Sequence, residues 1–201
     1  EIMFMDFITL AMDPLVNWAA KLRYVYDRSC PLVVRTPAGG GRGYGPTHSQ
    51  SLTAWFLHVP GLWVAVPSTP ADAAGLLRTA IRCDHPVLFV EHKRLYGRSG
   101  PVSGSLPPVS FGQARTIRRG RDITIAAWSW MAVEAEEAAR RLACDGIEAE
   151  VLDLRTLNPL DLDCLSESVR RTRRLLIVEE GVRRGGVAAD VTAMVLEAVF
   201  E

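Results

Sequence analysis

Runs of β-branched residues alternate with segments of helical periodicity along this chain, and the alternation restricts its fold more than any other feature. Three runs in the first half have the composition of buried strands, at residues 31–36, 60–67 and 85–92. Ser68-Thr69-Pro70 is expected to start a helix between the last two runs, with a hydroxyl residue to cap it and an end near residue 81. Strands separated by a helix are typical of parallel sheets, so we expect an α/β fold with mostly parallel strands.

The second half of the chain repeats this pattern. Strands are predicted at residues 122–128, 147–154 and 173–180. Asp161 is placed to cap a helix before the last of these strands, and a final helix with an apolar face follows Gly186. The second half is therefore also expected to be an α/β unit.

A segment rich in Gly, Pro and Ser, residues 93–112, separates the two halves. Its composition is typical of a linker or a long crossover and not of a core element. We therefore predict two domains, residues 1–107 and residues 108–201.

The N-terminal segment combines two patterns. It opens with a short apolar stretch that looks like a strand from Glu1 onward, and a helical stripe of apolar residues follows at Leu15, Trp18, Ala19, Leu22 and Tyr26. The chain thus starts inside a strand-like stretch and stops in a helix-like one. We expect it to be a fragment of a longer protein.

Residues 37–51, PAGGGRGYGPTHSQS, follow the first predicted strand and contain five glycines. Such a segment is predicted to be a loop, because glycine is unfavourable inside helices and strands but allows positive φ angles and close approach to a ligand. The loop brings His48 next to Ser49 and Gln50, at the end of a strand where α/β proteins bind ligands. A plain connection carrying a structural histidine is the alternative. A phosphate-binding loop is not indicated, since G-x-x-x-x-G-K-[ST] is absent.

Charge and cysteine content exclude several classes of protein. Lys plus Arg and Asp plus Glu both number 23, so a zero net charge does not favour nucleic acid as a partner. The four cysteines include no C-x-x-C pair, which argues against a zinc knuckle, a redox motif or a dense disulfide framework. No apolar run is long enough to span a membrane. A reducing cytoplasm is the expected location.

Four segments together resemble a known family. These are residues 33–51, 60–96, 151–161 and 175–186. Their order and spacing are similar to those of the beta subunit of the thiamine-diphosphate-dependent, decarboxylating component of 2-oxo acid dehydrogenase complexes. Enzymes for pyruvate, for branched-chain 2-oxo acids and for acetoin all belong to this family. The resemblance implies a transketolase-like pyrimidine-binding domain, truncated at its N-terminus, followed by a transketolase C-terminal domain.

The resemblance also implies a division of labour between subunits. In an alpha2beta2 assembly the alpha subunit holds the cofactor diphosphate through magnesium, while the beta subunit holds the aminopyrimidine. His48 matches the histidine that faces the reacting carbon and exchanges a proton during acyl transfer to the lipoyl arm of the acyltransferase core. Phe7 matches the aromatic that lies against the aminopyrimidine ring. Neither a nucleic acid nor a membrane is implied as a partner.

A structural potassium ion is a further implication of the family. The residues that match its ligands are Leu32, Ala80, Ile81, Cys83 and His85. Cys83 stands where the family has Asp, and His85 where it has Asn. Binding through backbone carbonyls would tolerate both changes, since potassium as a hard cation takes oxygen ligands. The alternative is that these residues only end a helix and lead into a strand.

The family's activating glutamate matches a position upstream of this sequence, and Glu1 does not take its place. The chain as it stands is therefore expected to be inactive alone. Two other functions remain open: another thiamine enzyme of the transketolase superfamily, or a noncatalytic assembly module of the same fold. The HSQ segment and the TPADAAGLL segment favour the dehydrogenase. The identity of the 2-oxo acid is not encoded here, because the acyl pocket is shared with the partner.

Overall fold

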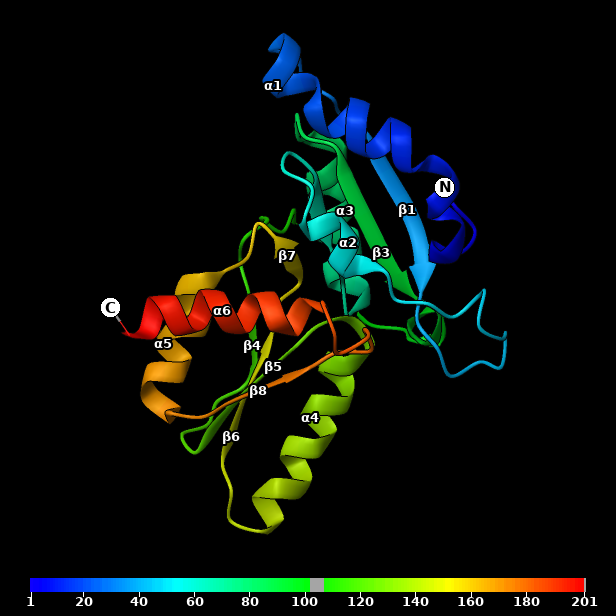
Figure 1. Ribbon diagram of the computed structural model, residues 1–201. Helices are drawn as coiled ribbons and strands as arrows, with labels where there is room; N and C mark the ends of the chain where they lie inside the picture. Colours follow the sequence, from blue (N-terminus) through cyan, green and yellow to red (C-terminus); the bar gives the residue numbers. More distant parts are fainter. Residues whose placement is uncertain (102–106, 201) are drawn as a thin grey trace.

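The computed structural model describes residues 1–101 and 107–200 of the chain. They form two four-stranded sheets with helices packed on both faces of each, which confirms the α/β class (Figure 1). Part of the predicted linker, residues 102–106, lies outside the described residues. The predicted domain boundary beside it stays a prediction.

The first sheet has the order β1 (Val33–Ala38), β3 (Val87–His92), β2 (Trp63–Ala65) and β7 (Thr156–Asn158). Its first three strands are parallel and are the three predicted from the first half, whereas β7 comes from the second half and runs antiparallel to β2. Strand β7 was not predicted, because three residues are too few to show a period. As expected, Thr69 caps α3 (Pro70–Arg82) by accepting a hydrogen bond from the Asp72 N–H at 3.1 Å.

The second sheet has the order β4 (Arg115–Arg118), β6 (Ala149–Asp153), β5 (Ile123–Ala127) and β8 (Leu175–Val178). Figure 1 shows α4 (Ser129–Cys144) on one face and α5 (Leu162–Thr172) with α6 (Val187–Phe200) on the other. The predicted strands β5, β6 and β8 are parallel. Asp161 caps α5 through the Cys164 N–H at 3.1 Å, as predicted.

The main hydrophobic core belongs to both halves of the chain. It joins Leu88 of β3 and Phe56 of α2 (Thr53–Leu57) to Leu152 of β6 and Val191 of α6, and all four side chains are at most 2% exposed. The opposite face of the first sheet has a smaller core, where Phe89 packs with Leu76 of α3. The carboxyl ends of the first sheet's parallel strands are therefore held against the second half of the molecule.

The N-terminal segment differs from its prediction. No strand forms at Glu1, and the segment is helical in four short pieces: η1 (Met5–Ala11), η2 (Pro14–Trp18), η3 (Ala19–Lys21) and α1 (Leu22–Tyr26). Because 3-10 and π turns alternate here, residues spaced for an α-helix do not stay on one face. Leu15 and Ala19 are buried, but Trp18 and Tyr26 are each 60% exposed, so the predicted stripe is only partly a core face.

The predicted linker begins later than expected. Residues Lys93–Gly97 continue β3 as a short 3-10 helix, η4, and Lys93 is only 5% exposed. The residue that starts this segment is therefore part of the packed interior. Its burial depends on the glycine loop and on the N-terminal segment, which are distant in sequence.

Candidate functional site

The glycine-rich loop leaves β1 after Ala38 and carries His48 back across the carboxyl end of the first sheet. Gly39 has a φ of +89°, and a Cβ there would lie 1.9 Å from Nε2 of His92 at the end of β3. Only glycine fits this position, since the backbone passes directly over a buried ring. The loop's path is thus determined by contact with the neighbouring strand.

The imidazole of His48 lies beside two phenylalanines of the N-terminal segment. Its ring centroid is 4.8 Å from that of Phe4 and 5.2 Å from that of Phe7, with edge-to-face interplanar angles of 82° and 83°. Nδ1 lies 3.1 Å from Oγ1 of Thr47. His48 is half-buried and Phe7 is 38% exposed, so both rings remain accessible from outside. The structure therefore brings the two predicted site residues together.

The backbone around His48 is held by two buried charged side chains that sequence reasoning missed. Lys93 donates a hydrogen bond from Nζ to the His48 carbonyl. Oδ1 of Asp6 accepts hydrogen bonds from the Gln50 N–H at 3.2 Å and from Gln50 Nε2 at 2.9 Å. Burial lowers the pKa of Lys93, and the negative charge of Asp6 opposes that shift. A charged residue directly after a buried strand was the only sequence signal for Lys93.

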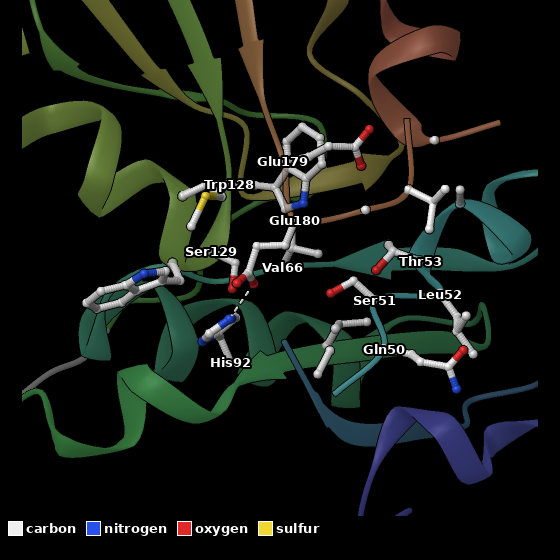
Figure 2. Close-up of a pocket in the computed structure, with 18 of the residues that line it drawn as sticks. Gln50, Ser51, Leu52, Thr53, Val66, His92, Trp128, Ser129, Glu179 and Glu180 are labelled. Atoms are coloured by element: carbon white, nitrogen blue, oxygen red, sulfur yellow. Dashed lines mark hydrogen bonds and ion pairs between the residues drawn. The ribbon is translucent and has the colours of Figure 1, made fainter. Parts of the chain in front are cut away.

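A pocket of about 340 Å³ adjoins the loop, between the two halves of the chain (Figure 2). Gln50 lies at one end, and His92 with Glu180 lies at the other. Its walls include Ser51 and Thr53 from the first half and Trp128 and Ser129 from the second. His48 is not among the residues that line it.

The end of this pocket at His92 holds a hydrogen-bonded contact between the two halves. Nε2 of His92 lies 2.5 Å from Oε2 of Glu180, while Nδ1 of His92 accepts a hydrogen bond from the Arg94 N–H at 3.2 Å. Burial raises the pKa of Glu180, but the hydrogen bond and charge of His92, aided by the Gly40 N–H, outweigh it and hold that pKa below its ordinary value. The glycine loop is therefore tied to the second half as well.

The five residues predicted to bind potassium gather where α3 ends and β1 and β3 begin. Sγ of Cys83 lies 3.3 Å from the carbonyl oxygens of both Ala80 and His85, and the Leu32 carbonyl accepts a hydrogen bond from the Val87 N–H. This arrangement does not fit a potassium ion, because a thiol fills the position that two of the carbonyls face. The residues present therefore argue against the predicted potassium site, and a comparison of stability in potassium and sodium salts is its test.

The side chains present can also be compared with what an aminopyrimidine ring and a metal ion require. An accessible aromatic ring next to an imidazole suits a flat heterocycle such as an aminopyrimidine. Over the described ranges, no group of three or more His, Cys, Asp or Glu side chains is arranged to hold a metal ion. Among the described helices, none is long and apolar enough to cross a membrane.

Comparison with family models matches both halves of the chain. Residues 1–99 match the transketolase pyrimidine-binding domain, and residues 112–201 match the transketolase C-terminal domain. The order of these two matches agrees with the order of the two sheets.

Individual relatives match over nearly the whole chain. The beta subunit of acetoin:2,6-dichlorophenolindophenol oxidoreductase from Cupriavidus necator is 46% identical over 202 residues, covering 100% of this chain and 60% of that protein. The pyruvate dehydrogenase E1 beta subunit of Rickettsia felis is 43% identical, covering 100% of this chain and 62% of that protein. The 2-oxoisovalerate dehydrogenase beta subunit of Bacillus subtilis is 42% identical, covering 98% and 61%.

A solved structure has the same fold. It is a split-gene transketolase described as an inactive beta4 tetramer, with a TM-score of 0.80 and 26% identity, and the match covers 97% of this chain and 61% of that one. The chain thus spans about three fifths of the length of the relatives it matches.

Proposed function

This chain belongs to the transketolase-like family that includes the beta subunits of thiamine-diphosphate-dependent 2-oxo acid dehydrogenases, and on that premise we propose that it serves the oxidative decarboxylation of a 2-oxo acid. The single observation that carries the proposal is the contact between His48 and Phe7, whose ring centroids are 5.2 Å apart. Phe7 and His48 are 41 positions apart in the sequence, and they come together here with both rings accessible. Identities of 42–46% to three kinds of beta subunit support the reaction class without selecting a substrate.

In this function Phe7 would hold the aminopyrimidine against its accessible aromatic ring, and His48 would exchange a proton with the substrate at its imidazole. Imidazole suits that role because its ordinary pKa lies near neutrality. Thiamine diphosphate, when bound, supplies the carbanion chemistry and the electron sink for loss of carbon dioxide. The loop of residues 37–51 would hold the imidazole beside the substrate, and lipoamide is the acyl acceptor in this proposal.

The remaining parts of the site belong to other polypeptides in this proposal. An alpha subunit holds the diphosphate and its magnesium in an alpha2beta2 assembly, and a lipoyl acyltransferase receives the acyl group. The division into a pyrimidine-binding domain, residues 1–107, and a C-terminal domain, residues 108–201, is part of the same proposal, as is a cytoplasmic location.

The test is turnover by the full-length subunit expressed together with its alpha partner. Pyruvate, 3-methyl-2-oxobutanoate and acetoin are each supplied with thiamine diphosphate and an artificial electron acceptor, and ketose donors for transketolase chemistry are assayed in parallel. We expect acceptor reduction with pyruvate or with 3-methyl-2-oxobutanoate. Turnover of acetoin alone would contradict the proposed decarboxylation, because acetoin has no carboxylate to lose. Turnover of a ketose donor alone would assign the chain to transketolase chemistry, and no turnover with saturating cofactor would support a noncatalytic module.

A further inference from the structure

Lys93 is a cation placed inside the protein, directly beneath the segment that carries the candidate imidazole. It is 5% exposed, and its Nζ donates to the backbone carbonyl of His48. The same Nζ lies 5.0 Å from the ring centroid of Phe4 and 5.4 Å from that of Tyr44. A buried ammonium is costly unless its surroundings replace water. Here a carbonyl and two aromatic faces do so, and all of them come from the glycine loop and the N-terminal segment.

Asp6 holds the same segment two residues further along. It is 7% exposed, and its Oδ1 accepts from both the backbone and the side-chain amide of Gln50. Among the described side chains, its other oxygen, Oδ2, has no hydrogen-bond partner. Asp6 directly precedes Phe7, so the carboxylate links the ring that would hold the cofactor to the loop that carries the imidazole.

The loop has little regular structure of its own. Gly39, Gly41, Gly43 and Gly45 all have positive φ angles, and no helix or strand forms between the end of β1 and the start of α2 at Thr53. Glycine-rich backbone loses the most conformational freedom when it is fixed. The hydrogen bonds of Lys93 and Asp6 act on the two consecutive peptide groups that flank Ser49, at the carbonyl of His48 and at the N–H of Gln50.

We propose that Lys93 and Asp6 are positioning residues that fix the His48–Gln50 backbone from two sides, so that the imidazole meets the substrate in one orientation. We call the hydrogen bonds of Lys93 and Asp6 to this backbone the clamp. Its consequence for catalysis rests on the function proposed above, whereas the clamp itself is a property of the folded chain. Lys93 acts through the backbone of His48 and does not touch the reacting atoms.

The clamp is tested without turnover by amide hydrogen exchange in the full-length subunit bound to its partner. Lys93→Met should accelerate exchange of residues 45–51 by about tenfold or more, because a hydrogen bond from a charged group is lost, while exchange in β3 and α3 stays as in the wild type. Lys21→Met, at the chain's other lysine, is the matched control and should leave the loop unchanged. Asp6→Ala removes the hydrogen bonds to Gln50 from the N-terminal segment and should accelerate amide exchange of the same residues.

Kinetics then separate positioning from plain stability. In Lys93→Met we expect kcat to fall by about tenfold or more, while KM and the dissociation constant of thiamine diphosphate change by less than about threefold, since misplacing a catalytic group affects the transition state most. Lys93→Arg, which keeps the donor and the charge, should recover part of kcat. Unchanged exchange at residues 45–51 in both Lys93→Met and Asp6→Ala overturns the clamp. If exchange is faster in these variants but the wild-type protein turns over no 2-oxo acid, the clamp stands and the proposed function is refuted instead.

Discussion

His92 and Glu180, 88 residues apart in sequence, meet with Nε2 and Oε2 2.5 Å from each other at the junction of the two halves of the chain. His92 ends β3 and is 4% exposed, whereas Glu180 follows β8 in the second sheet. Since Nδ1 of His92 accepts the Arg94 N–H, Nε2 is the ring nitrogen that donates to the carboxylate. The pair therefore links the two halves beside the glycine loop.

This pair makes the stability of the protein depend on pH in a defined direction. The pKa of Glu180 in the folded protein lies below the ordinary value of 4.5, so its stabilisation is present above that value and is lost as pH falls through the folded pKa. We expect Glu180→Gln to lower the free energy of unfolding by about 1 kcal/mol at pH 7, because a charge-assisted hydrogen bond becomes a neutral one. Urea unfolding at pH 7 and pH 4 measures the difference, which should shrink at the lower pH.

Glu137→Gln is the control for that experiment. Glu137 pairs with Arg140 and Arg141 on the exposed face of α4, and its loss should cost less than about 0.5 kcal/mol. A cost for Glu180→Gln that is the same at both pH values would mean that the charge of Glu180 contributes nothing to the contact.

Replacing His48 tests the proposed proton transfer. In the complete assembly, His48→Ala should bind thiamine diphosphate within about twofold of the wild type but lose at least about a hundredfold in kcat, the usual contribution of general acid–base catalysis. Steady-state kinetics and fluorescence titration of the cofactor provide the two measurements. His58→Ala, an exposed histidine just after α2, should behave like the wild type. Normal turnover in His48→Ala removes the imidazole from the mechanism.

Replacing Phe7 tests the contact with the aminopyrimidine. Phe7→Ala should weaken cofactor binding about tenfold, equivalent to about 1.4 kcal/mol, because an aromatic contact and its buried area are lost. Leu10→Ala is the matched control, since Leu10 lies on the same short helix and is 86% exposed. Should the dissociation constant in Phe7→Ala equal that of the wild type in a folded protein, Phe7 only packs against His48.

The Cys83 thiol decides whether this protein uses an alkali cation. Because Sγ lies between the carbonyls of Ala80 and His85, we expect the wild-type melting temperature to be the same in potassium chloride and sodium chloride. Cys83→Asp places an oxygen ligand there and should raise the melting temperature only in potassium chloride. A potassium-dependent rise in the wild type would show that the thiol turns away and that the ion binds as in the family.

The strands that sequence analysis located are those marked by the residues of the strand itself. Strands β1 and β3 begin with short apolar segments that contain valines, and Asp161 caps α5 by a purely local hydrogen bond. Such signals are contained within a few residues and survive folding unchanged. The N-terminal helical stripe failed because its turns are not uniformly α, and nothing local announces a change of turn type.

The candidate site divides in the same way. His48 was identified because glycines, an imidazole and a strand end coincide within residues 37–51. Phe7 was identified only by resemblance. Lys93 and Asp6 were missed, because a charged residue becomes an interior contact only when segments 44 or 45 residues away close over it. Burial of that kind depends on tertiary contacts, so it produces no periodic pattern in the sequence.

Strand β7 has a practical consequence for anyone dividing this chain. Its Asn158 and Thr156 complete a sheet whose other members all precede residue 93. A recombinant first half would leave the outer edge of β2 bare at Val64 and Ala65, with free backbone groups that invite strands from other molecules. Chimaeras between relatives should therefore exchange residues 156–158 together with the first half. Otherwise strands β2 and β7, which pair in one sheet, would come from different proteins.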